Sequence, residues 1–232
     1  MDIHEYLTQL NNESQSVFEK SKLKKENLGT LHHLSSCIYE FSGNIIDPQE
    51  KGILETVSAQ LESATFNLTL GLYRQAFSSL RLALEMGLAA IYFSANKMEL
   101  HEWLDGRMDI KWSKLVDEEN GVLSKRFAKA FSNNMGDEVE IYRKKAISVY
   151  RKLSEYVHGN NETWTENGIK LIYDEELFNK YCEYFRFVFE VVLFGAICRY
   201  AKLFDDETKE SLQFVPEEFN HISKIRELFG RE

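Results

Sequence analysis

A chain of 232 residues with 44% hydrophobic and 28% charged side chains is long enough to bury one substantial core. Its formal net charge of −9 argues against a broad nucleic-acid-binding surface, because phosphate affinity comes largely from accumulated Lys and Arg. Any contact with RNA must therefore be local.

Helix formers dominate the composition, and only two prolines and 12 glycines interrupt them. This balance predicts an all-α fold. The three cysteines, Cys37, Cys182 and Cys198, form no CxxC pair, which is typical of free thiols in a reducing compartment. With no export pattern at the N-terminus, we expect a cytoplasmic protein without a membrane segment.

The first half of the chain predicts four helices in order. Two lie over residues 3–25 and 30–41, divided near Gly29. The sequence Asp47-Pro48-Gln49-Glu50 places a capping Asp, a Pro and an acid in the order that starts a helix, which then runs to about residue 70. The fourth helix covers residues 72–95.

The region from residue 100 to 135 is less regular and predicts three short helices, over 101–106, 112–118 and 123–131. After it, Asp137 is expected to cap a longer helix that ends at His158 before Gly159-Asn160. This helix carries the strongest functional signal.

An Asn-Gly turn between β-prone residues predicts a small β-hairpin over residues 164–173, directly after the motif helix. Asp174 then starts a long apolar core helix to about residue 204, and Val215-Pro216-Glu217 starts a terminal one. We expect a single helical domain, with N-terminal helices over 1–45, a core bundle over 47–204 and a C-terminal extension over 205–232.

Arg151 and His158 share one face of the motif helix. Being seven residues apart, they differ by about 20° in direction and about 10.5 Å along the axis. Ser154 lies between them and Ile147 beside them. The face is separate from the predicted core stripe, which consists of Val139, Tyr142, Ala146, Val149, Tyr150, Leu153 and Val157.

An Arg and a His two helical turns apart suit the cleavage of RNA. The guanidinium binds and stabilises the scissile phosphate, and the imidazole transfers a proton near neutral pH. The reaction is attack of the ribose 2′-OH on its own phosphate, so DNA is spared. It requires neither a metal nor a cofactor.

Other residues are candidates for supporting roles. Arg81 and Glu85 lie on a polar flank of the helix over 72–95, where Arg81 would grip phosphate and Glu85 would orient a catalytic side chain. The alternative is a simple i,i+4 ion pair. Lys152 adds charge beside Arg151. Three basic clusters, each of which is also explained as a solvated helix face, are 20–25, 125–129 and 143–152.

The run Tyr150-Arg151-Lys152-Leu153-Ser154-Glu155-Tyr156-Val157-His158-Gly159 resembles the Arg-x(4–6)-His motif of the HEPN superfamily. These are helical-bundle proteins that include many prokaryotic toxin and antiviral defence ribonucleases. Looser similarity covers residues 76–85, 103–106 and 112–113. The resemblance implies a HEPN-type bundle, a homodimer with a composite active site, an RNA substrate, catalysis by Arg151 and His158, and an antitoxin or defence-system partner protein.

Two features depart from the family pattern. Lys152 stands where active members usually have Asn, Asp or His, and Gly159-Asn160 replaces the His-x-Tyr ending of the branch that is modified by a nucleotidyltransferase. That partnership is therefore disfavoured.

Two other functions fit the same residues. One is a catalytically silent HEPN-like module that binds a protein, nucleic acid or nucleotide; the other is a helical regulator unrelated to RNA. In either case His158 would stabilise the negative C-terminal end of the helix dipole, and Arg151 would form an ion pair with Glu155. Trp103, Trp112 and Trp164 are expected to pin loops to the core, with base stacking as the alternative.

Overall fold

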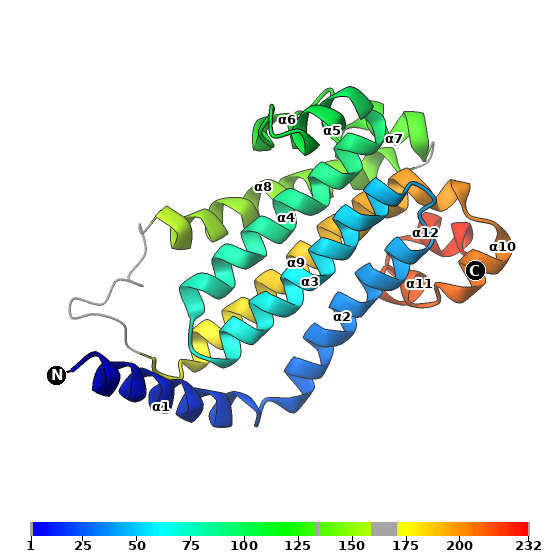
Figure 1. Ribbon diagram of the computed structural model, residues 1–232. Coiled ribbons are helices and arrows are strands. Elements are labelled where there is room, and N and C mark those ends of the chain that lie inside the picture. Colours follow the sequence, from blue (N-terminus) through cyan, green and yellow to red (C-terminus); the bar gives the residue numbers. More distant parts are fainter. Residues whose placement is uncertain (1, 133–134, 159–170, 232) are drawn as a thin grey trace.

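The computed structural model describes residues 2–132, 135–158 and 171–231, and every regular element in these ranges is helical (Figure 1). The all-α prediction is confirmed. Five long helices run alternately up and down and pack side by side. They are α2 (Lys25–Gly43), α3 (Pro48–Thr69), α4 (Tyr73–Ala95), α8 (Gly136–His158) and α9 (Glu175–Tyr200).

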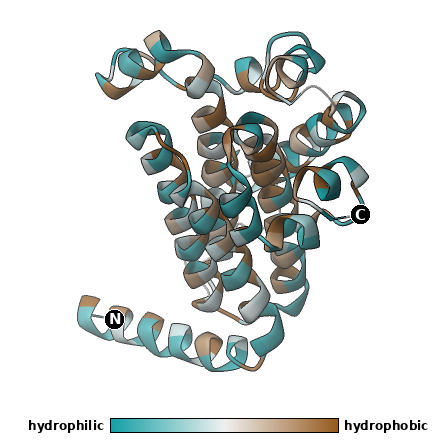
Figure 2. Ribbon diagram, turned by 90° about the vertical axis from the view of Figure 1, so that its right-hand side faces the viewer, coloured by the Kyte–Doolittle hydropathy of each residue, from teal (hydrophilic) through white to brown (hydrophobic). Residues whose placement is uncertain are grey.

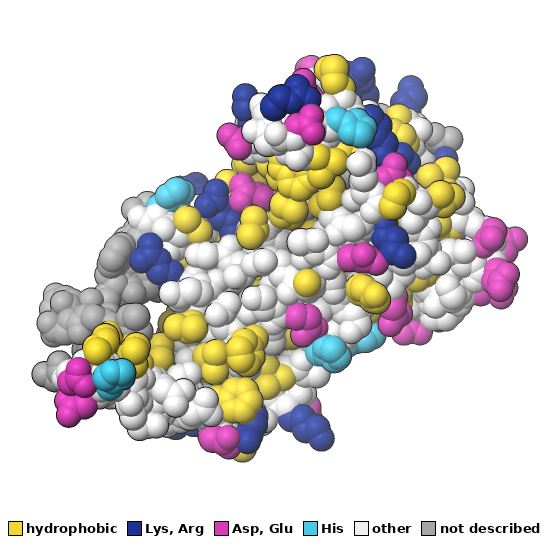
Figure 3. Space-filling model, viewed as in Figure 1, with side chains coloured by type: hydrophobic (Ala, Val, Ile, Leu, Met, Phe, Trp, Pro, Cys, Tyr) yellow, Lys and Arg dark blue, Asp and Glu magenta, His cyan; other side chains and the backbone are white. Residues whose placement is uncertain are grey.

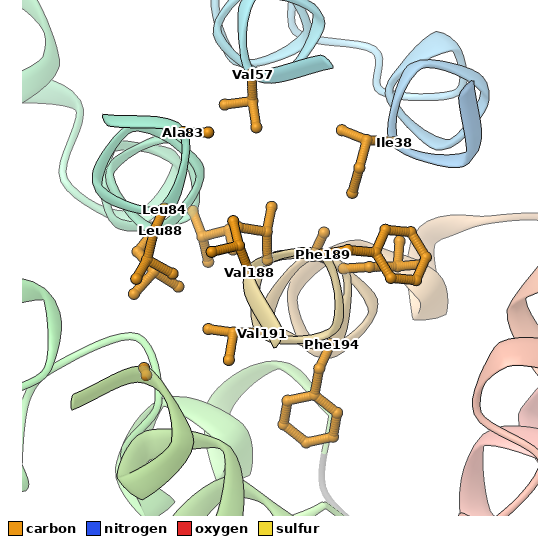
Figure 4. Close-up of a cluster of buried hydrophobic side chains, with 14 of the residues drawn as sticks. Ile38, Val57, Ala83, Leu84, Leu88, Val188, Phe189, Val191 and Phe194 are labelled. Carbon is orange, nitrogen blue, oxygen red and sulfur yellow. The ribbon is translucent and has the colours of Figure 1, made fainter. Parts of the chain in front are cut away.

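Helix α9 is the central element of the bundle. Eight consecutive residues, 191–198, are all buried, which means that every side of the helix is covered. It packs against α2, α4 and α8. Side chains of α9 point outward in different directions toward these neighbours (Figure 4). The prediction of a core helix here is confirmed.

Glycines let α4 and α9 approach closely. A Cβ atom at Gly87 would lie 2.5 Å from a methyl carbon of Val192, and one at Gly195 would lie 2.7 Å from Cδ1 of Ile91. No side chain fits in either space without displacing its neighbour. The backbones of the two helices therefore come together where a larger residue would force Val192 or the end of the Ile91 side chain to move.

The short helices cover one end of the bundle, above α4 and α8 in Figure 1. They are α5 (Lys97–Leu104), α6 (Trp112–Leu115) and α7 (Lys125–Phe131). Two tryptophans fasten them: Trp103 stacks on Phe93 with ring centroids 5.3 Å apart, and Trp112 stacks on Tyr150 at 3.8 Å. This matches the expected anchoring role. Trp164 lies outside the described residues.

The remaining elements flank the bundle. Helix α1 (Ile3–Ser21) lies across the end opposite the short helices (Figures 1 and 2), and Val17 at its C-terminal part packs beside Gly71. The C-terminal segment contains η1 (Ala201–Leu203), α10 (Asp206–Ser211), α11 (Phe214–Glu218) and α12 (Ser223–Leu228). Figure 2 shows the hydrophobic residues concentrated on the inward sides of the long helices.

Two of the three expected Asp caps are confirmed. The third, Asp137, is wrong, because α8 begins at Gly136 and Asp137 lies inside its first turn. The Asp47 side chain accepts hydrogen bonds from the backbone N–H groups of Gln49 and Glu50, and Asp174 accepts from that of Leu177. The side chain of Lys97 also donates to Asp47 and holds the pKa of that carboxyl below its usual range. Both helices thus begin at the predicted caps.

The predicted break near Gly29 is wrong. Helix α1 ends at Ser21 and α2 begins at Lys25, so Gly29 lies inside α2. A Gly in a helix costs about 1 kcal/mol, and burial of Leu31 and Leu34 on the same helix outweighs that cost. The break falls instead at residues 22–24, between Ser21 and Lys25.

The predicted β-hairpin is not supported. Most of it falls on residues 159–170, which lie outside the described residues, and the part that is described, 171–173, forms no strand. The described ranges contain no strand elsewhere.

One helix in the described part of the chain, α4, is long and apolar enough to cross a bilayer. Most of α4 is buried against α3, α8 and α9. Buried core helices can be equally long and apolar. The length and composition of α4 are therefore not evidence of a membrane segment.

We expect Gly87→Ala to destabilise the protein by about 1–3 kcal/mol, because the added methyl group overpacks the contact with Val192. This loss exceeds the gain of up to about 1 kcal/mol that Ala brings to a helix. Urea unfolding monitored by circular dichroism measures the change. Gly52→Ala is the matched control: nothing lies within 4 Å of a Cβ there, so stability should rise slightly. Equal gains in both variants would contradict the close-packing argument.

Candidate functional site

The exposed face of α8 agrees with the helical wheel. Five residues of the predicted core stripe are buried, while Tyr150 and Val157 are half-buried and Tyr156 is buried in addition. Tyr142, in the buried stripe, stacks on Phe194 of α9 with ring centroids 3.9 Å apart. Arg151 and His158 are both exposed. Figure 3 shows cationic and histidine side chains gathered over this end of α8.

Neither Arg151 nor His158 has a partner among the described residues. No hydrogen bond or ion pair in that part of the chain involves either side chain, and Glu155, the expected structural partner of Arg151, does not pair with it. Both side chains are exposed, and no described residue binds the guanidinium or the imidazole.

The carbonyl groups at the end of α8 are bound by Arg74 of α4. Its Nε donates to the carbonyl oxygen of Tyr156 and its Nη2 donates to that of Val157, both at 3.0 Å. The positive charge of Arg74 therefore already stabilises the negative C-terminal end of the helix dipole, which is the role that a purely structural His158 would have. The capping explanation for His158 is weakened accordingly.

The first two residues of α4 thus fix both neighbouring helix ends. Next to Arg74, the hydroxyl of Tyr73 accepts a hydrogen bond at 2.7 Å from the backbone N–H of Asp174, the cap of α9. The end of α8 and the start of α9 are held by adjacent residues. The position of His158 relative to the bundle is set by this anchor.

Arg81 and Glu85 bind Tyr150 rather than the motif residues. Nη2 of Arg81 donates to the Tyr150 hydroxyl at 2.5 Å, and that hydroxyl donates to Glu85 at 3.1 Å. Trp112 stacks on the Tyr150 ring. Burial raises the pKa of Tyr150, which keeps the phenol protonated. The cluster ties α4, α6 and α8 together, and its contacts are those of a structural support.

The other two supporting candidates lie on either side of the motif. Ser154 is half-buried between Arg151 and His158, and its hydroxyl donates to the carbonyl oxygen of Tyr150 at 2.7 Å. Lys152 turns away, with Nζ over the ring of Tyr184 in α9 at 5.2 Å. Only Ser154 shares the exposed face with the motif pair.

Acidic neighbours pair with part of the basic clusters. Several of their cations form ion pairs, which lowers the positive charge available to phosphate. These pairs are Lys22–Glu19, Lys24–Glu175, Arg143–Glu140, Lys144–Glu140 and Lys145–Glu190. Within the 143–152 cluster, the guanidinium of Arg143 is paired with Glu140, whereas that of Arg151 forms no ion pair with a described residue.

The cysteines do not supply a nucleophile. Burial raises the pKa of Cys37 and Cys198 to about 12 and that of Cys182 to about 11, so all three stay protonated near neutral pH. Within the described ranges, no group of three or more His, Cys, Asp or Glu residues could hold a metal ion.

Sequence reasoning missed the roles of Arg74 and Tyr150. Tyr150 has the periodicity of a core residue, and nothing local to Arg74 indicates that its partner lies more than 80 residues away in α8. Only the packing of α4 against α8 reveals both contacts.

With this geometry the protein is an all-helical bundle that exposes an Arg/His pair at the end of one helix. No protein-family model, no curated protein and no solved structure matches the chain.

We expect Arg74→Ala to loosen the last turn of α8, because two charge-assisted hydrogen bonds to carbonyl groups are lost. The free energy of unfolding should fall by about 1–3 kcal/mol. Hydrogen–deuterium exchange should accelerate selectively in residues 153–158. Arg107→Ala is the control, since Arg107 is exposed and pairs with Asp105 in a turn; it should change neither quantity. Unchanged exchange in the Arg74 variant would rule out the anchoring role.

Proposed function

We propose that this protein is a metal-independent endoribonuclease of HEPN type, acting in the cytoplasm in a bacterial defence or toxin system. One observation carries the proposal: Arg151 and His158 are exposed on one face of α8 and have no partners among the described residues, while Arg74 serves the helix end. The described residues therefore supply no structural partner for either side chain.

The chemistry assigns each residue one task. His158 acts as general base or acid: as the 2′-oxygen forms its bond to phosphorus, the proton leaves the hydroxyl, and a proton is delivered to the departing 5′-oxygen as its bond breaks. Arg151 stabilises the charge that builds on the non-bridging oxygens. The products are a 2′,3′-cyclic phosphate and a 5′-hydroxyl. In a composite site, Arg151 of one protomer and His158 of its partner act on the same phosphate.

A homodimer through the α4–α8 face supports such a composite site. Leu82 on α4 is 47% exposed and Ile147 on α8 is 38% exposed. Leu82 is the residue after Arg81, and Ile147 lies one turn before Tyr150. Because Arg81 and Tyr150 are in contact, Leu82 and Ile147 lie at a similar height along the bundle axis. Two-fold pairing of this face would bury apolar side chains beside two Arg/His pairs.

The decisive experiment is RNA cleavage by the purified full chain in EDTA. We expect cleavage that leaves 2′,3′-cyclic phosphate ends. His158→Ala and Arg151→Ala should each lower the rate by at least about 100-fold while the circular dichroism spectrum and melting temperature stay unchanged.

Matched controls are His32→Ala and Arg107→Ala. Each removes an exposed side chain of the same type that lies outside α8 and is paired, with Glu62 and Asp105 respectively, and each should cleave like the wild type. If the motif variants cleave RNA as fast as these controls, the proposal is wrong.

Co-expression of the His158→Ala and Arg151→Ala chains tests the composite site. A mixed dimer combines an intact Arg151 from one protomer with an intact His158 from the other, so part of the activity should return, up to about a quarter of the wild-type rate if two such sites exist per dimer. If each chain used only its own pair, none would return. That result would reject the composite arrangement but not catalysis.

A second candidate is a catalytically silent module that binds RNA or a partner protein, such as an antitoxin, through the same face. It is favoured by the engagement of Arg81 and Glu85 with Tyr150, which leaves neither of these side chains to orient the His158 imidazole. Binding without turnover, weakened by the same two variants, would identify this function.

A further inference from the structure

A pocket of about 640 Å³ lies between the C-terminal end of α4, helix α6 and helix α7. This volume is within the range of small-molecule binding sites. Neither Arg151 nor His158 lines it, so the pocket is separate from the motif face, and what it binds is independent of the proposed cleavage.

The apolar part of the pocket is aromatic. Tyr92, Phe127 and Phe131 line it, and the rings of Phe127 and Phe131 pack with centroids 4.7 Å apart. The guanidinium of Arg199 lies 4.5 Å from the centre of the Phe131 ring and fixes it from the side of α9. Aromatic walls of this kind accept a planar ring by stacking.

The polar part of the pocket offers both donors and acceptors. Asn96 lines the pocket; its amide nitrogen donates to the carbonyl oxygen of Tyr92, and its side-chain oxygen has no partner among the described residues. Ser113 is exposed at the pocket wall, and its hydroxyl has no partner among the described residues. Such groups match the edge of a nucleobase, which carries donors and acceptors side by side.

The rim of the pocket carries a cation with unused donors. Arg126 is exposed and donates from Nη1 to the Asn120 side chain. It forms no ion pair with a carboxylate in the described part of the chain, so most of its N–H groups stay open. Lys114, in contrast, is held by Glu99 at 2.9 Å. Asp117 directs Oδ1 to the backbone N–H groups of its own turn. Arg126 is thus the group that would meet an anion.

We propose that this pocket binds a mononucleotide. The base stacks against the aromatic wall, Asn96 and Ser113 contact its edge, and the phosphate pairs with Arg126. An aromatic surface, mixed hydrogen-bonding groups and a fork-shaped cation at the rim correspond to the three parts of a nucleoside monophosphate. The volume leaves room for the ribose between them.

Isothermal titration calorimetry on the full chain tests the proposal, with AMP, GMP, CMP and UMP as probes. At least one of them should bind saturably, and at least about tenfold more tightly than its nucleoside or inorganic phosphate alone. Arg126→Ala should weaken that binding by at least about tenfold. Lys125→Ala, which removes the neighbouring exposed cation of α7, is the matched control and should bind like the wild type.

Ala95→Trp provides a variant that fills the pocket. Ala95 is exposed at the last residue of α4 and lines the cavity, so a large side chain is tolerated by the fold and should abolish binding. His158→Ala should bind the nucleotide as the wild type does, which separates this pocket from the cleavage site.

Three results would overturn the proposal. The first is that no monophosphate binds saturably. The second is binding that is lost in His158→Ala but kept in Arg126→Ala, which would assign the nucleotide to the motif face. The third is affinity for an RNA oligonucleotide through Arg126 without affinity for any mononucleotide, which would make the region a surface for RNA.

Discussion

The arrangement of the whole bundle depends on the burial of helix α9. Because residues 191–198 are apolar on every side, they must be surrounded, and α2, α4 and α8 provide the cover. Gly87 and Gly195 let α4 come close enough to complete it. The buried residues of α8 between Val139 and Leu153 pack against α9 and α4. The opposite face of α8 is therefore exposed to solvent. The exposure of Arg151 and His158 is therefore a consequence of how the core is filled.

Helix α4 connects the core to both candidate sites. Its first turn binds the end of α8 through Arg74, its middle holds Tyr150 through Arg81, and its last residues line the pocket. Helix α6 reaches both places as well: Trp112 stacks on Tyr150, and the next residue, Ser113, lines the pocket. One rigid element thus positions two separate groups of side chains, which is more precise than placement on loops.

Charge pairing limits how the protein can meet nucleic acid. The net charge is −9, and several cations of the basic clusters are paired with acids. Arg151 and Arg126 keep open guanidinium groups at two different places. If contact with phosphate involves only these groups, binding should depend weakly on salt concentration. A recognition mode of this kind favours a defined loop or a small ligand over a long duplex.

The sequence by itself determined the features that depend on neighbours a few residues apart. The caps at Asp47 and Asp174, the apolar core helix and the outward face of Arg151 and His158 follow from local hydrogen bonds and helical periodicity. Only the tertiary structure decided the continuity of α2 through Gly29, the anchoring of α8 by Arg74, the capture of Tyr150 by Arg81 and Glu85, and the pocket at Arg126. These depend on contacts between helices that are distant in sequence, where burial outweighs local preference and the partner cannot be read from spacing.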